Sequence, residues 1–310
     1  MKITALAGGV GGAKLAHGLA RVLPPRDLTV IVNTADDFEH LGLHISPDLD
    51  TVCYTLAGVA SRETGWGRAE ESWNVVKALE KLGAPTWFRL GDRDLATHLE
   101  RTRRLAQGEP LSEVVGEFCR GWGINQIILP MTDARVATML HTDEGDLEFQ
   151  EYFVHRRCRP RVHAIEFLGI DAAAPAPGVI EALNSADGVI LCPSNPWVSI
   201  GPILALPGIR PVLAGRKAAA VSPIVGGRAL RGPADKMYTE MGMQASALAV
   251  AAQYRDIVGG FVMDLKDAEL AASVRSLGMR TLVSNTIMRT VPDRQRLARD
   301  VLEFLQADWK

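Results

Sequence analysis

The chain has 310 residues, of which 47% are hydrophobic and 23% charged, a composition typical of a folded globular protein and not of a disordered or fibrous one. With 34 Lys and Arg against 36 Asp and Glu, the formal net charge is −2, so no strong basic field exists to bind nucleic acid or an anionic membrane. The apolar runs are far shorter than the ~20 residues of a membrane span, and the first residues do not resemble a secretory signal. We therefore expect a cytoplasmic protein that binds any phosphate ligand locally.

Short runs rich in β-branched residues alternate with longer stretches of helical periodicity. This alternation is typical of parallel strands joined by crossover helices, so the sequence predicts a Rossmann-like, doubly wound α/β fold with a mostly parallel sheet. The expected strands are 3–7, 28–33, 126–129, 188–192, 218–222, 259–263 and 280–283. The expected helices are 13–23, 47–59, 70–82, 94–106, 111–120 and 294–306.

Two segments interrupt this alternation within what we predict to be a single domain over residues 1–310. Residues from about 60 to 125 are expected to form a helical insertion. Residues from about 135 to 165 alternate apolar and polar side chains, which predicts an inserted antiparallel hairpin. The four cysteines are widely separated, with no Cys-x-x-Cys pair, and this spacing favours buried free thiols over a zinc site.

The first strand ends in a glycine-rich loop, Gly8-Gly-Val-Gly-Gly-Ala-Lys. Glycines let the backbone approach a ligand closely, and the helix that follows offers unpaired N–H groups to an anion. The loop lacks the third glycine of the dinucleotide fingerprint and the Gly-Lys-Ser/Thr of a P-loop. It therefore predicts a phosphate or nucleotide site, with a tight turn that binds no ligand as the alternative.

Acidic residues follow the second strand. Asp36 and Asp37 lie at the carboxyl edge of the expected sheet, where a ribose, Mg²⁺ or only solvent could face them. Helix capping explains Ser46 and Asp48 without any function. Asp50 lies instead beside the apolar stripe of its helix, so its carboxylate needs a partner, either a metal ion or a substrate hydroxyl.

Later segments add further candidates. Arg89 precedes a helix whose start is explained by a cap from Asp92 or Asp94, yet Arg89 could also contact a ligand ring or phosphate. Two more strand ends carry hydroxyl, amide and glycine N–H groups. Several such loops at one sheet edge predict a composite nucleotide site. The residues concerned are Ser194, Asn195, Ser222, Gly226 and Gly227.

Together these segments resemble one family, the 2-phospho-L-lactate transferases of coenzyme F420 biosynthesis, called CofD, with FbiA as the mycobacterial counterpart. The similarity covers nearly the whole chain. It rests on Gly8-Gly-Val-Gly-Gly-Ala-Lys, Val32-Asn-Thr-Ala-Asp-Asp, Ser46-Pro-Asp-Leu-Asp-Thr, Arg89-Leu-Gly-Asp-Arg-Asp-Leu-Ala-Thr-His, Phe149-Gln-Glu, Pro193-Ser-Asn-Pro with Ser199-Ile-Gly-Pro, and Ser222-Pro-Ile-Val-Gly-Gly.

The resemblance implies an enzyme that moves a phosphorylated three-carbon acid from a GDP-linked donor (LPPG or EPPG) to the ribityl hydroxyl of the deazaflavin Fo. The acid is 2-phospholactate, or phosphoenolpyruvate in the bacterial variant, and phosphoglycerate is a third candidate. The products would be F420-0 or dehydro-F420-0 and GMP, and Mg²⁺ would be required. The resemblance also implies a homodimer.

The resemblance further implies roles for individual residues. Asp50 and Arg89 would contact Fo. We predict Asp37 and Asp50 as the Mg²⁺ ligands and as the catalytic residues. The guanosine diphosphate part would be bound by Gly8, Gly9, Gly11, Gly12, Lys14, Ser194, Asn195, Ser222, Gly226 and Gly227.

Two other functions stay open. A nucleotide-sugar-binding regulator similar to the YvcK group would share the glycine loop but would transfer nothing, and the segments Ser46–Thr51 and Arg89–His98 disfavour it. An NAD-dependent oxidoreductase is disfavoured by the missing third glycine and by the additional acidic residues.

Overall fold

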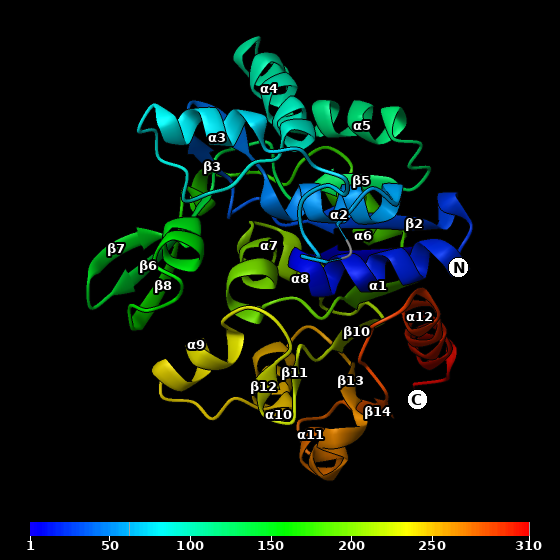
Figure 1. The fold of residues 1–310 in the computed structure, drawn as a ribbon. Helices are drawn as coiled ribbons and strands as arrows, with labels where there is room; N and C mark the ends of the chain where they lie inside the picture. Colours follow the sequence, from blue (N-terminus) through cyan, green and yellow to red (C-terminus); the bar gives the residue numbers. More distant parts are fainter. Residues whose placement is uncertain (62, 310) are drawn as a thin grey trace.

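The structure is a computed structural model that describes residues 1–61 and 63–309. Its centre is a seven-stranded sheet in the order β14-β13-β10-β9-β1-β2-β5, in which every neighbouring pair is parallel (Figure 1). All seven predicted strands form this sheet, so the predicted α/β class is confirmed. The strands are β1 (Ile3–Ala7), β2 (Leu28–Val32), β5 (Ile127–Pro130), β9 (Gly188–Leu191), β10 (Ala218–Val221), β13 (Gly260–Asp264) and β14 (Arg280–Ser284).

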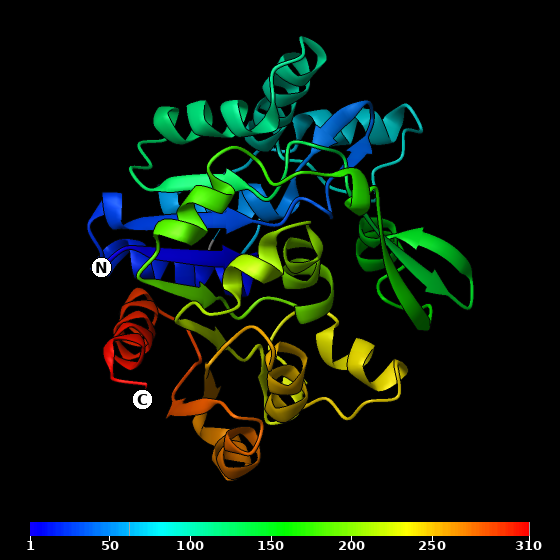
Figure 2. The ribbon, with the colours of Figure 1, turned by 180° about the vertical axis from the view of Figure 1, so that it is seen from behind.

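Helices cover both faces of this sheet because successive strand residues point to opposite sides. In β1, Ala5 and Ala7 pack with one group of helices and Leu6 with the other. The first face carries α1 (Gly9–Val22), α2 (Pro47–Ala57), α5 (Leu111–Gly121) and α12 (Val291–Gln306). The opposite face, seen in Figure 2, carries α6 (Val179–Ser185), α7 (Gly201–Ala205), α8 (Ile209–Leu213), α9 (Ala234–Glu240), α10 (Ala247–Tyr254) and α11 (Ala271–Arg275).

The order of the strands places the carboxyl ends of β1, β2 and β9 side by side. The chain runs from β1 to β2 on one side and later returns to pair β9 with the other side of β1. The loops after β1 and β9 therefore diverge at this point and leave a crevice, the usual ligand position in doubly wound sheets. No helix among the described residues has the length and apolar character that spanning a membrane requires.

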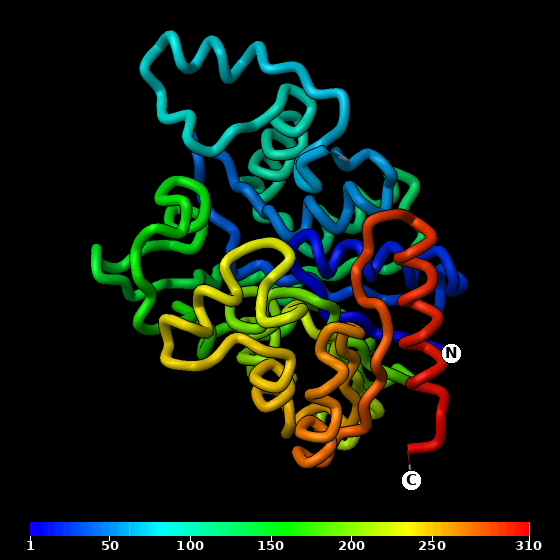
Figure 3. Tube along the Cα trace, turned by 60° about the horizontal axis from the view of Figure 1, so that its bottom comes forward, coloured from blue at the N-terminus to red at the C-terminus, as the bar shows by residue number. Residues whose placement is uncertain are grey.

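The segment between β2 and β5 contains most of the inserted structure. A short hairpin of β3 (Phe38–His40) and β4 (Leu43–Ile45), which the sequence analysis did not predict, precedes α2. α3 (Asn74–Lys81), α4 (Asp92–Ala106) and α5 then follow. Figure 3 shows the cyan chain around α3 projecting beyond the sheet and its helices.

The starts of α3 and α4 correct two predictions. α3 begins at Asn74 rather than at residue 70, and α4 begins at Asp92 rather than at residue 94. Asp92 does not cap its own helix, because its carboxylate accepts hydrogen bonds from the N–H groups of Asn74 and Val75 at the start of α3. Glu71 instead accepts from the first N–H groups of α4. The two helices thus cap each other, α3 through Asp92 at the start of α4, and α4 through Glu71 shortly before α3.

The predicted hairpin is a three-stranded antiparallel arm. β6 (Ala137–Thr142) pairs with β7 (Gly145–Glu148) on one side, as predicted, and with β8 (Val162–Leu168) on the other. The alternation predicted strand structure over all of residues 135–165, and this is wrong for Glu151–His155, which forms a π-helical turn. The remaining short elements are η1 (Pro25–Asp27), η3 (Ile170–Ala172), η4 (Pro196–Ile200), η5 (Leu265–Leu270), β11 (Ile224–Val225) and β12 (Arg228–Ala229).

Candidate active site

A cavity of about 990 Å³ opens at the carboxyl ends of the central strands. Gly8 follows β1, Asp36 follows β2, Pro193 follows β9 and Ser222 follows β10, and all four line it. Its volume lies at the upper end of the range usual for small-molecule sites, so it can hold a ligand of nucleotide size together with a second molecule.

The segment predicted as a glycine-rich loop, Gly8–Lys14, forms one part of the lining. We keep the name glycine loop for it, although α1 begins at Gly9 rather than at residue 13, so that all of the segment except Gly8 lies in the first turns of this helix. Gly8 N–H donates to Ser194 Oγ at 3.0 Å, which joins the loops after β1 and β9. A Cβ on Gly11 would lie 2.2 Å from the carbonyl oxygen of Pro193, so only glycine permits this contact. Gly8, Gly9, Gly11 and Lys14 line the cavity as predicted, whereas Gly12 packs against Ser194 outside the lining.

Two carboxylates lie beside this loop. Asp48 Oδ1 accepts from Gly9 N–H at 2.7 Å, and the amide nitrogen of Asn33 lies 3.0 Å from Asp48 Oδ2 and 3.2 Å from Asp36 Oδ2. Burial raises the pKa of Asp48 to about 6, although the hydrogen bonds from Asn33 and Gly9 lower it. Burial and the neighbouring charge of Asp48 hold the pKa of Asp36 well above its usual value. Asp48 does lie in the first turn of α2, as expected, but its carboxylate accepts from Gly9 at the start of α1, so its position in α2 does not by itself account for it.

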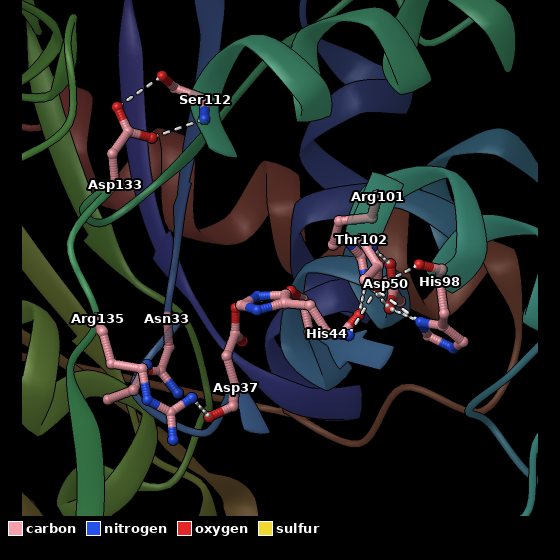
Figure 4. Close-up of polar contacts among 12 residues, drawn as sticks. Asn33, Asp37, His44, Asp50, His98, Arg101, Thr102, Ser112, Asp133 and Arg135 are labelled. Carbon is pink, nitrogen blue, oxygen red and sulfur yellow. Dashed lines mark hydrogen bonds and ion pairs between the residues drawn. The ribbon is translucent and has the colours of Figure 1, made fainter. Parts of the chain in front are cut away.

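Asp37 follows Asp36 in the sequence and is also buried, but its carboxylate has other hydrogen-bond partners than those of Asp36 and Asp48. Its Oδ2 accepts from Ser46 Oγ at 2.7 Å and lies 3.2 Å from His44 Nε2, while its Oδ1 has no hydrogen-bond partner. Ser46 also does not cap α2 through its side chain. Figure 4 shows Asp37 beside His44. Asp37 lies outside the cavity lining.

Asp50 lines the cavity from α2 and has a charged partner within the protein. Both of its carboxylate oxygens accept from the guanidinium of Arg101 on α4, Oδ2 at 3.1 Å from Nη1 and Oδ1 from Nη2 (Figure 4). His98 Nδ1 lies 3.8 Å from Asp50 Oδ2. The sequence analysis expected a partner for the Asp50 carboxylate, and Arg101 is such a partner.

Positively charged side chains face the cavity from several elements. Burial, together with the charges of Arg294 and Arg231, lowers the pKa of Lys14, which indicates a local excess of positive charge beside the glycine loop. Arg89 lies over the ring of Trp73, with 4.7 Å between its Cζ and the ring centroid. An anionic ligand beside Lys14 would offset the repulsion between Lys14 and the charges of Arg294 and Arg231. The cations in the lining are Lys14, Arg89, Arg157, Arg231, Lys266 and Arg289.

Aromatic side chains form another part of the lining. Trp87 and Phe88 contact each other edge-on, and the rings of Phe149 and Phe153 are stacked at 5.4 Å. Trp66 adds a ring that is 47% exposed. Such a surface suits a flat conjugated ring.

The predicted residues of the later loops are only partly in the lining. Ser194, Asn195 and Ser222 line the cavity as predicted. Gly226 and Gly227 lie outside it, in the turn between β11 and β12, with φ values of +57° and +77° that this tight hairpin requires. Gly226 N–H already donates to Asp267.

The sequence analysis missed several lining residues. Tyr54, Asp94 and His98 line the cavity together with Asp50. Their spacing on α2 and α4, at four-residue intervals, places each set on one helix face and was the signal available in the sequence. Among the described residues, no group of three or more His, Cys, Asp and Glu side chains is arranged to hold a metal ion.

Comparisons with known proteins agree with this architecture. The model of one family, described as 2-phospho-L-lactate transferase CofD, matches residues 3–294. A phosphoenolpyruvate transferase from Streptomyces griseus subsp. griseus is 43% identical over 314 residues, which cover 99% of each chain. A 2-phospho-L-lactate transferase from Methanothermobacter thermautotrophicus is 40% identical over 300 residues, which cover 97% of each chain. A solved structure of a UPF0052 family member from Bacillus halodurans, at 14% identity, has a TM-score of 0.63 and covers 97% of this chain and 98% of that one, a likeness of fold alone.

Proposed function

Because this chain belongs to the CofD family of transferases, as its sequence motifs predicted, we propose that it transfers a phospho-acid from a GDP-linked donor to the ribityl hydroxyl of Fo. Relatives named for phosphoenolpyruvate transfer and for 2-phospholactate transfer support the reaction class. The identity of this chain to the S. griseus phosphoenolpyruvate transferase favours EPPG as the donor, with GMP and dehydro-F420-0 as products.

The observation that carries this proposal is the mixed lining of this cavity. The N–H groups of Gly8 and Gly9 already donate within the protein, but Val10, Gly11 and the cation Lys14 also line the cavity at the start of α1 and suit the diphosphate of the donor. The aromatic group around Trp87 and Phe149 suits the flat ring of the acceptor. Asp50 and Arg89, which the family resemblance assigns to Fo, line the same cavity.

The reaction joins the two ligands at phosphorus. The acceptor hydroxyl oxygen forms a bond to the phosphorus that bears the acid, the bond from this phosphorus to the bridging oxygen breaks, and the electron pair leaves with GMP. Asp50 accepts the hydrogen bond of the hydroxyl and receives its proton. Phosphoryl-type transfers depend mostly on positioning and charge neutralisation, which is what the amides, cations and carboxylates of this lining supply.

The family also implies a divalent cation, for which the carboxylates can be tested. Asp37 and Asp50 stay predicted ligands, but Ser46 and His44 engage Asp37 and Arg101 engages Asp50. Asp36 and Asp48 fit Mg²⁺ better: both line the cavity, their pKa values are raised, and Asp36 Oδ1 is buried without a partner. Mg²⁺ is commonly held by one or two carboxylates with water and substrate phosphates, and when bound it would neutralise charge on the diphosphate.

The direct test is to incubate the protein with Fo, Mg²⁺ and each of three GDP-linked donors, carrying phosphoenolpyruvate, 2-phospholactate or phosphoglycerate. We expect GMP and a product of the corresponding mass to appear in equal amounts, fastest with EPPG. GDP binding without GMP release from any donor would contradict the proposal and favour a regulator that only binds nucleotides.

A variant tests the metal assignment separately. Asp48→Asn removes one carboxylate charge beside the glycine loop and is expected to lower Mg²⁺-dependent turnover on the order of 100-fold, since positioning of the charged groups carries the reaction. Asp133→Asn is the matched control, because Asp133 accepts from Ser112 at the start of α5 and lies outside the lining. Equal activity of the two variants would exclude Asp48 as a ligand.

The resemblance also supports a homodimer in the cytoplasm as part of this proposal. Light scattering coupled to size-exclusion chromatography measures the oligomeric state, and a monomer at all concentrations would reject the dimer.

A further inference from the structure

Arg101 has no role in the proposed function, yet it is paired with a residue that does. Asp50 lines the cavity, whereas Arg101 is 1% exposed and lies outside the lining. The guanidinium donates to both oxygens of the Asp50 carboxylate. A bidentate pair of this kind fixes the plane of the carboxylate as well as its position.

Arg101 is itself held in place by further contacts. Its Nη1 lies 3.3 Å from His98 Nδ1, and His98 Nε2 lies 3.3 Å from Asp94 Oδ1. Tyr54 donates to the same Asp94 oxygen at 2.7 Å. These five residues, Asp50, Tyr54, Asp94, His98 and Arg101, form a buried chain of polar contacts between α2 and α4, part of which Figure 4 shows.

This network is a costly way to join two helices. Removing a guanidinium and a carboxylate from water carries a desolvation penalty that their attraction repays only with good geometry, and apolar residues often join elements more stably. Helices α2 and α4 nevertheless place their charged residues beside the cavity. Stability alone therefore does not account for the pair.

The geometry leaves Asp50 able to bind a ligand. A carboxylate offers roughly four lone-pair sites, and the bidentate pair with Arg101 uses one on each oxygen. The remaining sites are available on a carboxylate that lines the cavity. We propose that Arg101 is a positioning residue, which holds the Asp50 carboxylate in the orientation that accepts the acceptor hydroxyl. This inference rests on the proposed function, to which it adds a residue that touches neither substrate.

The test compares Arg101→Lys with the wild-type enzyme. Lysine keeps the charge but loses the planar fork, so the carboxylate is no longer fixed. We expect kcat to fall on the order of 100-fold, while the donor KM and the affinity for GDP, measured by calorimetry, stay within about twofold. His98→Gln, which removes one contact of Arg101 without touching its ion pair, is expected to lower kcat by about tenfold. It serves as the second variant if Arg101→Lys does not fold.

Arg104→Lys is the matched control. Arg104 lies one turn further along α4, is 7% exposed and is ion-paired with Glu109 and Glu117 outside the cavity lining. We expect it to lower the melting temperature without changing kcat. The positioning role would be overturned if kcat is unchanged in both Arg101→Lys and His98→Gln, or if GDP affinity falls in parallel with kcat. In that case turnover by the wild-type enzyme would still support the proposed function. Absence of wild-type turnover would overturn both.

Discussion

His17 on α1 illustrates how the charges around one side chain determine pH dependence. Burial, followed by the charges of Arg294 and Arg21, lowers the pKa of His17 to about 4. Between pH 4 and the ordinary pKa of 6.5, His17 is protonated in the unfolded state but not in the folded state. The free energy of unfolding is therefore highest above pH 6.5 and decreases as the pH falls towards 4.

The wild-type protein should lose unfolding free energy when the pH is lowered from 7 to 5. We expect this loss to be smaller in His17→Gln by about 1–2 kcal/mol, allowing for partial solvent screening. Urea denaturation at the two pH values measures this difference. His163→Gln, the same substitution at an exposed position on β8, is the control. Identical pH dependence in His17→Gln and wild type would contradict the assignment.

Individual acidic residues also show how far sequence reasoning extends. The position of Asp50 beside an apolar stripe indicated that it needs a partner, for which we expected a metal ion or a substrate hydroxyl, and the partner that the structure shows is Arg101. Arg101, however, is separated from it by 51 residues, and it is the packing of α4 against β4 that brings it there. Asp48 satisfied a local rule as a helix cap, and nothing local revealed that Gly9 and Asn33 bind its carboxylate.

At the scale of elements, the glycine loop connects two strand ends. Gly11→Ala would place a Cβ 2.2 Å from the backbone oxygen of Pro193, which cannot move as a flexible side chain does. We expect a loss of roughly 1–3 kcal/mol in unfolding free energy and a loss of GDP affinity, since the loop after β9 must shift. Unchanged melting temperature and GDP affinity in Gly11→Ala would contradict the packing described for this loop.

Gly116→Ala tests the same substitution at a position where we expect the unfolding free energy to rise rather than fall. Gly116 lies inside α5, where an added Cβ would meet only the end of the Arg120 side chain at 3.8 Å. Alanine has the higher helix propensity, so we expect a gain of about 0.5–1 kcal/mol and no effect on GDP binding. Thermal unfolding measures the gain, and a loss of stability would show that α5 packs more tightly than described.

The elements themselves were largely predictable, because their signals are local. Buried strands rich in Val, Ile and Ala and helices with apolar stripes stand out along the chain, and all seven central strands were identified. The caps of α3 and α4 were not, since Asp92 and Glu71 each serve the neighbouring helix. The hairpin of β3 and β4 was missed because each strand has only three residues.

At the scale of the whole molecule, the order of strands in the sheet creates the cavity. The glycine loop, the carboxylates after β2 and on α2, and the loop after β9 are separated in sequence and meet at the point where β1 pairs with both β2 and β9. Family motifs identified most of these segments. The aromatic part of the lining depends on how the inserted helices and the antiparallel arm fold over the sheet, which sequence periodicity does not specify.

The central claim is that this single cavity holds both substrates at once. The most direct measurement is a calorimetric titration of Fo into the protein with Mg²⁺, first alone and then saturated with GDP. The account predicts that Fo binds the GDP-saturated protein at least as tightly as the free protein, and that Asp50→Asn weakens Fo binding but not GDP binding. Competition between Fo and GDP, or Fo binding that is insensitive to Asp50→Asn, would contradict it.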